Sequence, residues 1–292
     1  MIRAARFRPA GPYSLALTAR GANDATRVWR DGVLRAVVAG EQATAWQLPD
    51  RTVVIRGSEQ GIERLRWILA LDDDHTEFLR RFKHDRLLRG PIAHLQGKRV
   101  LRVDTVALAL LRALCGQLIE SRRARAIERR IIRELSPCVG DLHAAPTRDV
   151  LAQAAPVQLR AHGLHARRGA TLARLCRAVD LERLHALPID AVEQRLLRER
   201  GLGPWSLGVI ALEGLGRYDR GLVGDLGLVK LAIALERRWV EGHETGALLE
   251  PYEEWAGLAS VYLMAGFARG LIPLPDGEPI RKPPHRISSR AA

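Results

Sequence analysis

The chain of 292 residues lacks several features that mark common protein classes. Its three cysteines, Cys115, Cys138 and Cys176, are widely spaced and form no CxxC pair, which argues against a zinc ribbon or an iron–sulfur cluster and predicts reduced thiols. The opening MIRAARFRPAGP has no apolar signal-peptide core, and no apolar run is long enough to cross a bilayer. We therefore expect a cytoplasmic protein with no side-chain metal site and no membrane contact.

The chain is also poor in lysine, since only four of its 46 basic residues are lysines. Genomic base composition accounts for part of the preference for arginine, but not for the excess of positive charge. With 33 acidic residues the formal net charge at pH 7 is +13, which indicates an electrostatic bias toward a polyanion. Apolar residues make up 47% of the chain, so a substantial core can be buried.

The first third of the chain has the pattern of a small α+β unit. Alternating apolar residues predict four strands, and Asp31-Gly32 is a strong two-residue hairpin signal between the first two. A helical period follows after Ser58, a suitable N-cap, and a second helix is expected to stop at Pro91. The expected strands cover residues 26–30, 33–38, 43–48 and 52–56, and the helices cover 58–71 and 77–88.

No convincing strand pattern appears after Asp104, and the rest of the chain reads as helices. We predict an α+β fold in which a small N-terminal antiparallel-sheet domain with helices (residues 1–98) precedes an all-α domain (99–272) and a basic, proline-rich tail (273–292). The expected helices cover 106–118, 121–135, 147–154, 159–163, 166–179, 189–198, 205–212, 226–239 and 253–268.

The stretch GLGPW at residues 201–205 joins two of these helices. Gly201 can take a positive φ, Gly203 allows close approach of the backbone, and Pro204 suits the first turn of a new helix. The unpaired amides at that turn lie at the positive end of the helix dipole, which predicts a phosphate site that reads no sequence. The alternative is an ordinary helix hairpin; a dinucleotide-binding turn is disfavoured because no strand precedes it and the spacing is not GxGxxG.

A second feature lies in VGDLGLVK, where Asp225 stands at the start of a predicted helix. As an N-cap, its carboxylate would be held in a fixed direction. Helix capping alone is one interpretation, and catalysis is another. The two do not exclude each other, because a cap also fixes the rotamer that chemistry needs.

Together, GLGPW and VGDLGLVK, with Asp225 22 residues after Gly203, resemble the helix-hairpin-helix/Gly-Pro-Asp superfamily of DNA glycosylases, and within it the bacterial 3-methyladenine DNA glycosylase II group. The resemblance spans about residues 100–270, and a sheet-containing domain before the helices fits the same group. It implies that Gly201, Leu202 and Gly203 hold a DNA phosphate and that Asp225 is the catalytic carboxylate.

Two further stretches carry the resemblance. LLRALCGQLIES, residues 110–121, resembles the Gly-Gln-Leu turn of the family, which implies that Gln117 contacts DNA and that Leu118 is the wedge at the vacated base. VYLMAGF, residues 261–267, resembles the last helix and implies that Tyr262 lies against the extruded base. The alternative for both Leu118 and Tyr262 is ordinary core packing. Val209 stands where an aromatic is expected, so the substrate pocket departs from the family pattern.

Trp205 bears on the type of chemistry. Bifunctional members of the family carry a lysine two residues after the second glycine, and this chain has Trp205 there. The resemblance therefore implies a monofunctional glycosylase that flips out an alkylated base of the 3-methyladenine or 7-methylguanine type and breaks its N-glycosidic bond with help from Asp225, in base excision repair. Trp205 is also a candidate for the pocket, while Lys230 and, on the basic helix, Arg122 and Arg125 are candidates for phosphate contacts.

Two other functions remain open from the sequence. One is a non-catalytic helix-hairpin-helix module that recognises damaged DNA, and the other is a glycosylase for deaminated or oxidised bases. In each case we expect a monomer that binds double-stranded DNA containing damaged bases and is associated with the nucleoid. No cofactor is expected, apart from a monovalent cation that the resemblance allows at the hairpin carbonyls.

Overall fold

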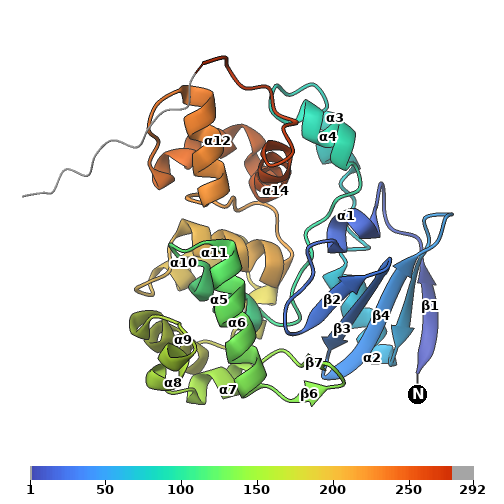
Figure 1. Cartoon of the computed structure of the whole chain (residues 1–292), viewed down its shortest axis with the longest axis vertical. Helices are drawn as coiled ribbons and strands as arrows, with labels where there is room; N and C mark the ends of the chain where they lie inside the picture. Colours follow the sequence, from blue (N-terminus) through green and yellow to red (C-terminus); the bar gives the residue numbers. More distant parts are fainter. Residues whose placement is uncertain (1, 278–292) are drawn as a thin grey trace, which may run out of the picture.

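The computed structural model describes residues 2–277 and contains a sheet unit and two groups of helices (Figure 1). The sheet is antiparallel with the strand order β1-β5-β4-β3-β2. Asp31 and Gly32 have φ of 51° and 79°, as a two-residue turn of mirror-image type requires. The strands are β1 (Arg3–Phe7), β2 (Arg27–Arg30), β3 (Val33–Val38), β4 (Glu41–Gln47) and β5 (Val53–Gly57).

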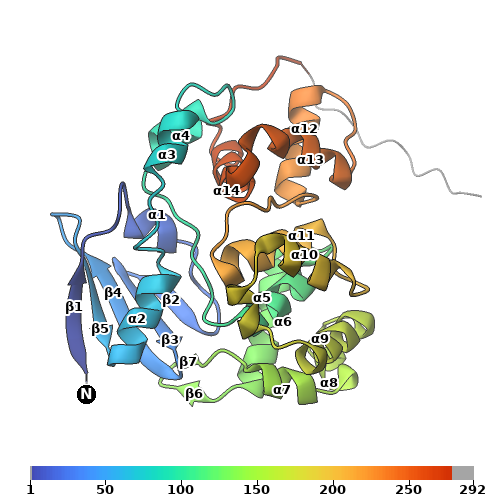
Figure 2. The same ribbon diagram turned by 180° about the vertical axis from the view of Figure 1, so that it is seen from behind.

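The four expected strands are present within two residues of their predicted bounds, whereas β1 was not predicted. Its sequence RAARF carries two arginines and no β-branched residue, which an edge strand tolerates. Helix α2 (Glu59–Ile68) covers one face of the sheet (Figure 2), and its N-cap Ser58 accepts a hydrogen bond from the Gly61 amide as expected. The short helix α1 (Leu15–Ala19) contributes Leu15 to the same core.

The helical part begins earlier than predicted. The helix expected over 77–88 is two helices, α3 (Thr76–Arg81) and α4 (Arg89–Leu95), and Pro91 lies in the first turn of α4, where its missing N–H costs no hydrogen bond. Phe78 and Leu95 are buried in the core of the helical part and not in that of the sheet. The helical core thus includes residues that precede the expected domain boundary at residue 98, and that boundary stays a prediction.

The remaining elements follow the predicted order with small differences. The expectation of no strand after Asp104 is wrong, because Cys138–Val139 (β6) and Leu142–His143 (β7) form a small hairpin against β3. The helices are α5 (Val106–Gly116), α6 (Ser121–Leu135), α7 (Arg148–Gln153), α8 (Pro156–Ala161), α9 (Ala166–Ala178), α10 (Ile189–Leu197), α11 (Pro204–Val209), α12 (Leu226–Glu236), α13 (Thr245–Leu249) and α14 (Ala256–Phe267), with a π-helical turn η2 (Ile210–Leu215) and 3₁₀ turns η1 (Glu182–Ala186), η3 (Gly242–Glu244) and η4 (Glu250–Trp255).

Figures 1 and 2 show that the chain order does not match the spatial grouping. Helices α12 to α14 lie together with α3 and α4 in one group, while α5 to α11 form the other. Asp225 starts α12, and Trp205 lies on α11, so the two motifs found in the sequence come from different groups and meet between them.

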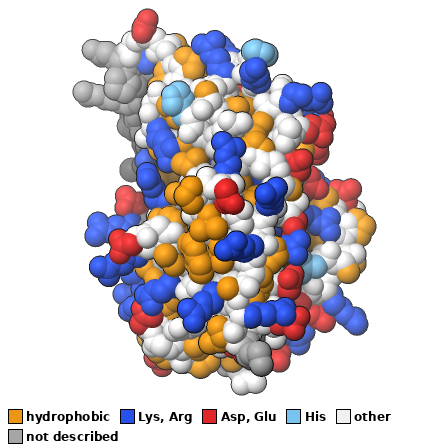
Figure 3. Space-filling model, turned by 90° about the vertical axis from the view of Figure 1, so that its right-hand side faces the viewer, with side chains coloured by type: hydrophobic (Ala, Val, Ile, Leu, Met, Phe, Trp, Pro, Cys, Tyr) orange, Lys and Arg blue, Asp and Glu red, His pale blue; other side chains and the backbone are white. Residues whose placement is uncertain are grey.

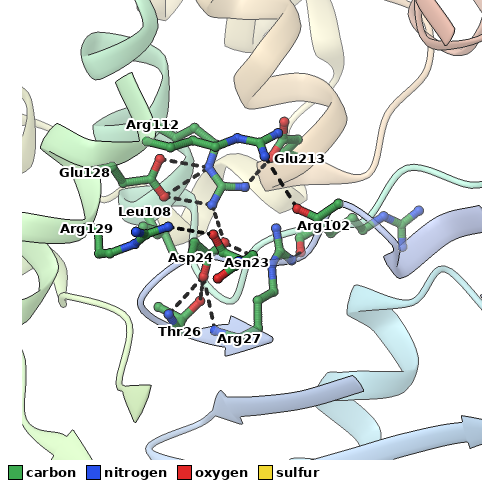
Figure 4. Close-up of polar contacts among 12 residues, drawn as sticks. Asn23, Asp24, Thr26, Arg27, Arg102, Leu108, Arg112, Glu128, Arg129 and Glu213 are labelled. Atoms are coloured by element: carbon green, nitrogen blue, oxygen red, sulfur yellow. Dashed lines mark hydrogen bonds and ion pairs between the residues drawn. The ribbon is translucent and has the colours of Figure 1, made fainter. Parts of the chain in front are cut away.

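A buried charge cluster joins the sheet unit to the helices (Figure 4). Arg112 of α5 makes ion pairs with Asp24 before β2 (2.8 Å), Glu128 of α6 (2.7 Å) and Glu213 of η2 (2.6 Å). Burial alone would lower the pKa of Arg112, but the three carboxylates outweigh it and raise this pKa. The cluster therefore fixes α5 relative to the segment before β2, to α6 and to the π-helical turn η2.

The surface is basic without a single concentrated patch on the side shown in Figure 3. Lys and Arg side chains are scattered over that whole side and surround an area of hydrophobic side chains. No helix in the described part of the chain has the length and apolar content to cross a membrane.

Candidate active site

The hairpin between α10 and α11 has the predicted backbone geometry. Gly201 has a φ of +95°, which a residue with a side chain rarely adopts, and Pro204 is the first residue of α11. At Gly203 an added Cβ would meet no atom within 4 Å, so this part of the hairpin faces open space. Leu202 is half-buried against the helical core. The amides at the start of α11 are thus presented at an open surface, as a phosphate site requires.

Asp225 is the N-cap of α12, and both of its carboxylate oxygens accept hydrogen bonds. Oδ1 accepts from the amide of Gly227 (2.8 Å), and Oδ2 accepts from the indole Nε1 of Trp205 (2.9 Å). The side chain remains partly exposed. The carboxylate is therefore held in one orientation, and each oxygen keeps a further lone pair with which it can accept from a ligand.

Trp205 also contacts the end of α5. A Cβ placed on Gly116 would stand 2.5 Å from a ring carbon of Trp205, so only glycine leaves room for the indole in this position. Trp205 is half-buried and thus connects three parts of the site: the end of α5, the hairpin on which it lies, and Asp225.

The turn after α5 projects Leu118 from the protein. Its side chain is 97% exposed, and its φ is +55°, a region that costs a non-glycine residue about 1 kcal/mol or more. The core-packing alternative for Leu118 is therefore wrong. An exposed leucine on strained backbone is what a wedge into DNA requires, although its insertion remains a prediction.

Gln117 contacts the hairpin within the protein. Its amide Nε2 donates hydrogen bonds to the carbonyl oxygen of Gly201 (2.6 Å) and to Oγ of Ser206 (3.0 Å). These two bonds use the amide hydrogens within the protein, while the side-chain oxygen Oε1 keeps its acceptor positions, and the expected DNA contact of Gln117 stays a prediction. Gln117 also joins the turn after α5 to the hairpin, and sequence reasoning did not identify Ser206 as its partner.

Two of the expected pocket residues do not face an opening. Tyr262 is fully buried, its hydroxyl donates to the carbonyl oxygens of Leu95 and Lys98 (3.2 Å each), and burial raises its pKa. Val209 is 6% exposed and packs in the same core. The expectation of a base against Tyr262 is therefore corrected: α14 is apolar around its circumference, so Tyr262 belongs to its packing surface.

Sequence reasoning missed Leu226, which follows Asp225 and is 54% exposed. The signal that the sequence offers is its place directly after the capping aspartate. Leu226 is thus an exposed apolar residue next to Asp225 in the chain, and Trp205 is a partly exposed one that donates to the Asp225 carboxylate.

The three expected phosphate-binding side chains differ in their surroundings. Arg122, near the start of α6 and four residues after Leu118, is exposed and has no hydrogen-bond or ion-pair partner among the described residues. Arg125 is exposed but donates a long hydrogen bond to the Gly21 carbonyl (3.5 Å), which ties α6 to the sheet unit. Lys230 is exposed on α12 beside a surface hollow that also involves the segment near Leu274.

The described residues include no group of three or more His, Cys, Asp or Glu side chains placed to hold a metal ion. Two of the hairpin carbonyls, those of Arg200 and Gly201, already accept hydrogen bonds from side chains. The Arg200 carbonyl accepts from Thr171 (3.2 Å) and from the guanidinium of Arg174 (3.4 Å), and the Gly201 carbonyl accepts from Gln117. One of these donors is charged and would repel a cation at the Arg200 carbonyl, while a monovalent cation elsewhere on the hairpin stays a prediction.

No protein-family model matches the chain, but curated relatives do. It is 25% identical over 205 residues to a DNA-3-methyladenine glycosylase of Bacillus subtilis, a match that covers 66% of this chain and 67% of that protein. It is 28% identical over 208 residues to the probable bifunctional transcriptional activator/DNA repair enzyme AlkA of Mycobacterium tuberculosis, covering 66% of this chain. The match spans only 40% of that longer protein.

Solved structures share the fold over nearly the whole chain. The 3-methyladenine DNA-glycosylase of Archaeoglobus fulgidus matches with a TM-score of 0.79 at 18% identity, covering 91% of this chain and 98% of that one. The 8-oxoguanine glycosylase/lyase of Clostridium acetobutylicum, solved with double-stranded DNA, matches with a TM-score of 0.76 at 17% identity, covering 92% and 98%. The comparisons confirm the predicted fold class and the resemblance to helix-hairpin-helix glycosylases.

Proposed function

We propose that this chain, whose sequence and fold resemble the helix-hairpin-helix/Gly-Pro-Asp DNA glycosylases, is a monofunctional glycosylase that excises alkylated bases from double-stranded DNA in base excision repair. The observation that carries the proposal is the Asp225 carboxylate, held at both oxygens beside an open hairpin and an exposed wedge residue.

Binding of DNA would use the hairpin and the turn after α5. The amides at the start of α11 and the exposed guanidinium of Arg122 would contact phosphates, and Leu118 would occupy the space that an extruded base leaves. Extrusion costs a few kcal/mol, and less for a damaged base, so phosphate contacts and the wedge need to offset only a modest free energy.

Asp225 would act on the sugar. Cleavage of an N-glycosidic bond builds positive charge on the deoxyribose, and an ionised carboxylate in a fixed position stabilises that charge without reorganising. An alkylated purine already carries positive charge and leaves readily, so the site needs no strong general acid. Asp225 also accepts from the neutral indole of Trp205, which does not cancel its negative charge.

The residue at position 205 favours hydrolysis without strand cleavage. A lyase needs an amine that attacks the sugar carbon, and Trp205 offers an N–H that is already bonded to Asp225. Trp205 is only partly buried, and an aromatic face that a flipped base could reach would favour an electron-poor base over a neutral one. We assign the alkylated-base preference to this surface, in place of the buried Tyr262.

The deciding experiment measures which base is released. Duplexes containing 7-methylguanine, 3-methyladenine, 8-oxoguanine or uracil would be incubated with the protein, and free bases measured by mass spectrometry. We expect release of the two methylated purines and no covalent adduct on borohydride reduction. Release of 8-oxoguanine with a trapped adduct would instead support an oxidised-base glycosylase/lyase. Tight duplex binding with no base released would support the non-catalytic module.

The hairpin, the wedge residue and Asp225 all come from one chain, so we further propose that the protein acts as a monomer. Its place would be on nucleoid DNA in the cytoplasm. Light scattering of the protein on a short damaged duplex should give a one-to-one complex, and a two-to-one mass would contradict the monomer.

A further inference from the structure

The contact between Trp205 and Asp225 is more than packing. The indole Nε1 donates to Oδ2 at 2.9 Å, while the ring lies on Gly116 at the end of α5. Trp205 is half-buried, and Ser206 beside it is 2% exposed, so the first turn of α11 is anchored on its inner side. The hydrogen bond to Asp225 and the contact with Gly116 therefore restrict the Trp205 side chain from two directions.

The hydrogen bond fixes the plane of the carboxylate. The Gly227 amide holds Oδ1, as a helix cap does, but a carboxylate held at one oxygen can still turn about its last bond. The second donor at Oδ2 removes that freedom. Each oxygen has a further lone pair, so the bonded carboxylate keeps acceptor positions for the sugar.

The chemical nature of the donor matters. An arginine or lysine in this place would hold the carboxylate equally well, but its charge would offset the negative charge that the sugar cation needs. The indole N–H is a donor without net charge, and it has no acceptor function that could bind a proton. Trp205 can therefore orient Asp225 without neutralising it.

The position of the indole is in turn fixed from α5. Gly116 leaves space for the ring, since a Cβ would stand 2.5 Å from it. The next residue, Gln117, donates to Gly201 and Ser206 on either side of Trp205. The end of α5 and the start of α11 are thus held together around the ring, one residue before the wedge Leu118.

We propose that Trp205 is a positioning residue for the glycosylase reaction: its indole N–H orients the Asp225 carboxylate, and its ring is located by Gly116. This rests on the proposed function. The role is separate from any contact of the ring with a base, because it depends on one nitrogen and on the absence of a side chain at residue 116.

The first experiment tests the hydrogen bond without any enzyme assay. The chain has six tryptophans, so a sample with ¹⁵N-labelled indoles should give six indole N–H signals. We expect the Trp205 signal, assigned by its loss in Trp205→Phe, to exchange slowly with solvent and to shift in Asp225→Asn. A Trp205 signal unchanged by Asp225→Asn would overturn the contact, whether or not the protein proves to be a glycosylase.

The second experiment isolates the N–H in catalysis. Benzothienylalanine at position 205 keeps the bicyclic ring and replaces the N–H with sulfur. Under single-turnover conditions with saturating protein we expect its rate of base release to fall about 10- to 100-fold, as for loss of a hydrogen bond to a charged group. Duplex affinity should stay within twofold of wild type. A full rate with benzothienylalanine and a reduced rate with Trp205→Phe would assign the effect to ring size and overturn the proposal.

The third experiment tests the support from α5. In Gly116→Ala the added methyl group must displace the indole, so we expect a similar fall in rate and the same loss of slow exchange at the Trp205 signal. Gly246→Ala is the matched control, because its Cβ would meet only Val223 at 3.9 Å, an ordinary contact. A Gly116→Ala variant as fast as Gly246→Ala would remove Gly116 from the proposal.

Discussion

Two aromatic residues of the resemblance, Trp205 and Tyr262, have opposite surroundings. Trp205 is half-buried and donates to a partly exposed carboxylate, whereas Tyr262 is fully buried and donates to the main-chain carbonyls of Leu95 and Lys98. The two residues thus differ in the group that accepts their hydrogen bond, a side-chain carboxylate for Trp205 and main-chain carbonyls for Tyr262. The Trp205 N–H donates to a carboxylate that keeps free acceptor positions for a ligand, which indicates a role in the site. The Tyr262 hydroxyl donates to main-chain carbonyls, which indicates a role in the stability of the fold.

Tyr262 belongs to a group that we call the aromatic core cluster: His75, Phe78, Tyr218, Trp255 and Tyr262. His75 and Tyr218 have ring centroids 4.8 Å apart, and Phe78 and Tyr262 have centroids 5.3 Å apart. The cluster joins α3 to α14 and to the segment after η2. Its members should therefore affect the free energy of unfolding, while residues around Trp205 should affect base release.

The largest effect is expected for Asp225→Asn, which keeps a side-chain oxygen for the Gly227 amide but removes the charge. We expect the single-turnover rate of base release to fall about 10²- to 10³-fold, as for loss of a major electrostatic stabiliser. Asp74→Asn is the control, because Asp74 likewise accepts an amide hydrogen bond, from Thr76, away from the site. Equal rates for the two variants would remove Asp225 from catalysis.

The next effect concerns His75 in the aromatic core cluster. It is 2% exposed, and burial, followed by the charges of Arg99 and Arg102, lowers its pKa to about 3. In the unfolded chain His75 takes up a proton near pH 6.5, whereas in the folded protein it stays neutral down to about pH 3. The contribution of His75 to the free energy of unfolding is therefore fully present above pH 6.5. It is lost as the pH falls toward 3, by at most about 1.4 kcal/mol per pH unit.

Replacement of His75 by phenylalanine should remove this pH dependence, because phenylalanine does not titrate. The replacement should break no hydrogen bond, since neither ring nitrogen of His75 has a partner among the described residues. Urea unfolding of His75→Phe between pH 7 and pH 4 should give a flatter curve than wild type, and the exposed His84→Gln should match wild type. Parallel curves for His75→Phe and wild type would show that His75 is protonated in the folded protein.

A smaller effect is expected for Leu118→Ala. Loss of the wedge should lower the rate of base release about tenfold, because part of the few kcal/mol needed for extrusion is no longer offset. The free energy of unfolding should hardly change, since the side chain is 97% exposed. Val157→Ala, at a position 73% exposed on α8, is the control. A stability loss in Leu118→Ala with an unchanged rate would place this leucine in the fold.

The smallest effect is expected for Tyr262→Phe. The single hydroxyl hydrogen is shared between the carbonyl oxygens of Leu95 and Lys98, so removal of the hydroxyl should lower the free energy of unfolding by about 1 kcal/mol. The rate and the base preference should remain within twofold of wild type. A changed base preference with unchanged stability would return Tyr262 to the substrate pocket and reverse the comparison with Trp205.

The sequence was sufficient where a local rule determines the geometry. Gly201 has the predicted positive φ, Asp225 and Ser58 cap the helices expected of them, and the Asp31-Gly32 turn is in place. These features depend on a few neighbouring residues and on backbone conformations that few residue types adopt.

The sequence was insufficient where packing between distant segments decides. The apolar helix α14 gives no periodicity that would show which face Tyr262 occupies. The ion pairs of Arg112 join residues up to 101 positions apart, and the bond from Trp205 to Asp225 joins residues 20 apart across two helix groups. Strand β1 was missed because pairing with β5, and not its own composition, makes it a strand.

The central claim is that Asp225 faces the positive charge that develops on the sugar. The most direct measurement compares binding to two duplexes, one with a cationic pyrrolidine in place of the damaged nucleotide and one with a neutral tetrahydrofuran. We predict that wild type binds the cationic duplex at least about tenfold more tightly, as a transition-state mimic should bind, and that Asp225→Asn binds the two equally. An equal preference for the cationic duplex in wild type and Asp225→Asn would contradict the account.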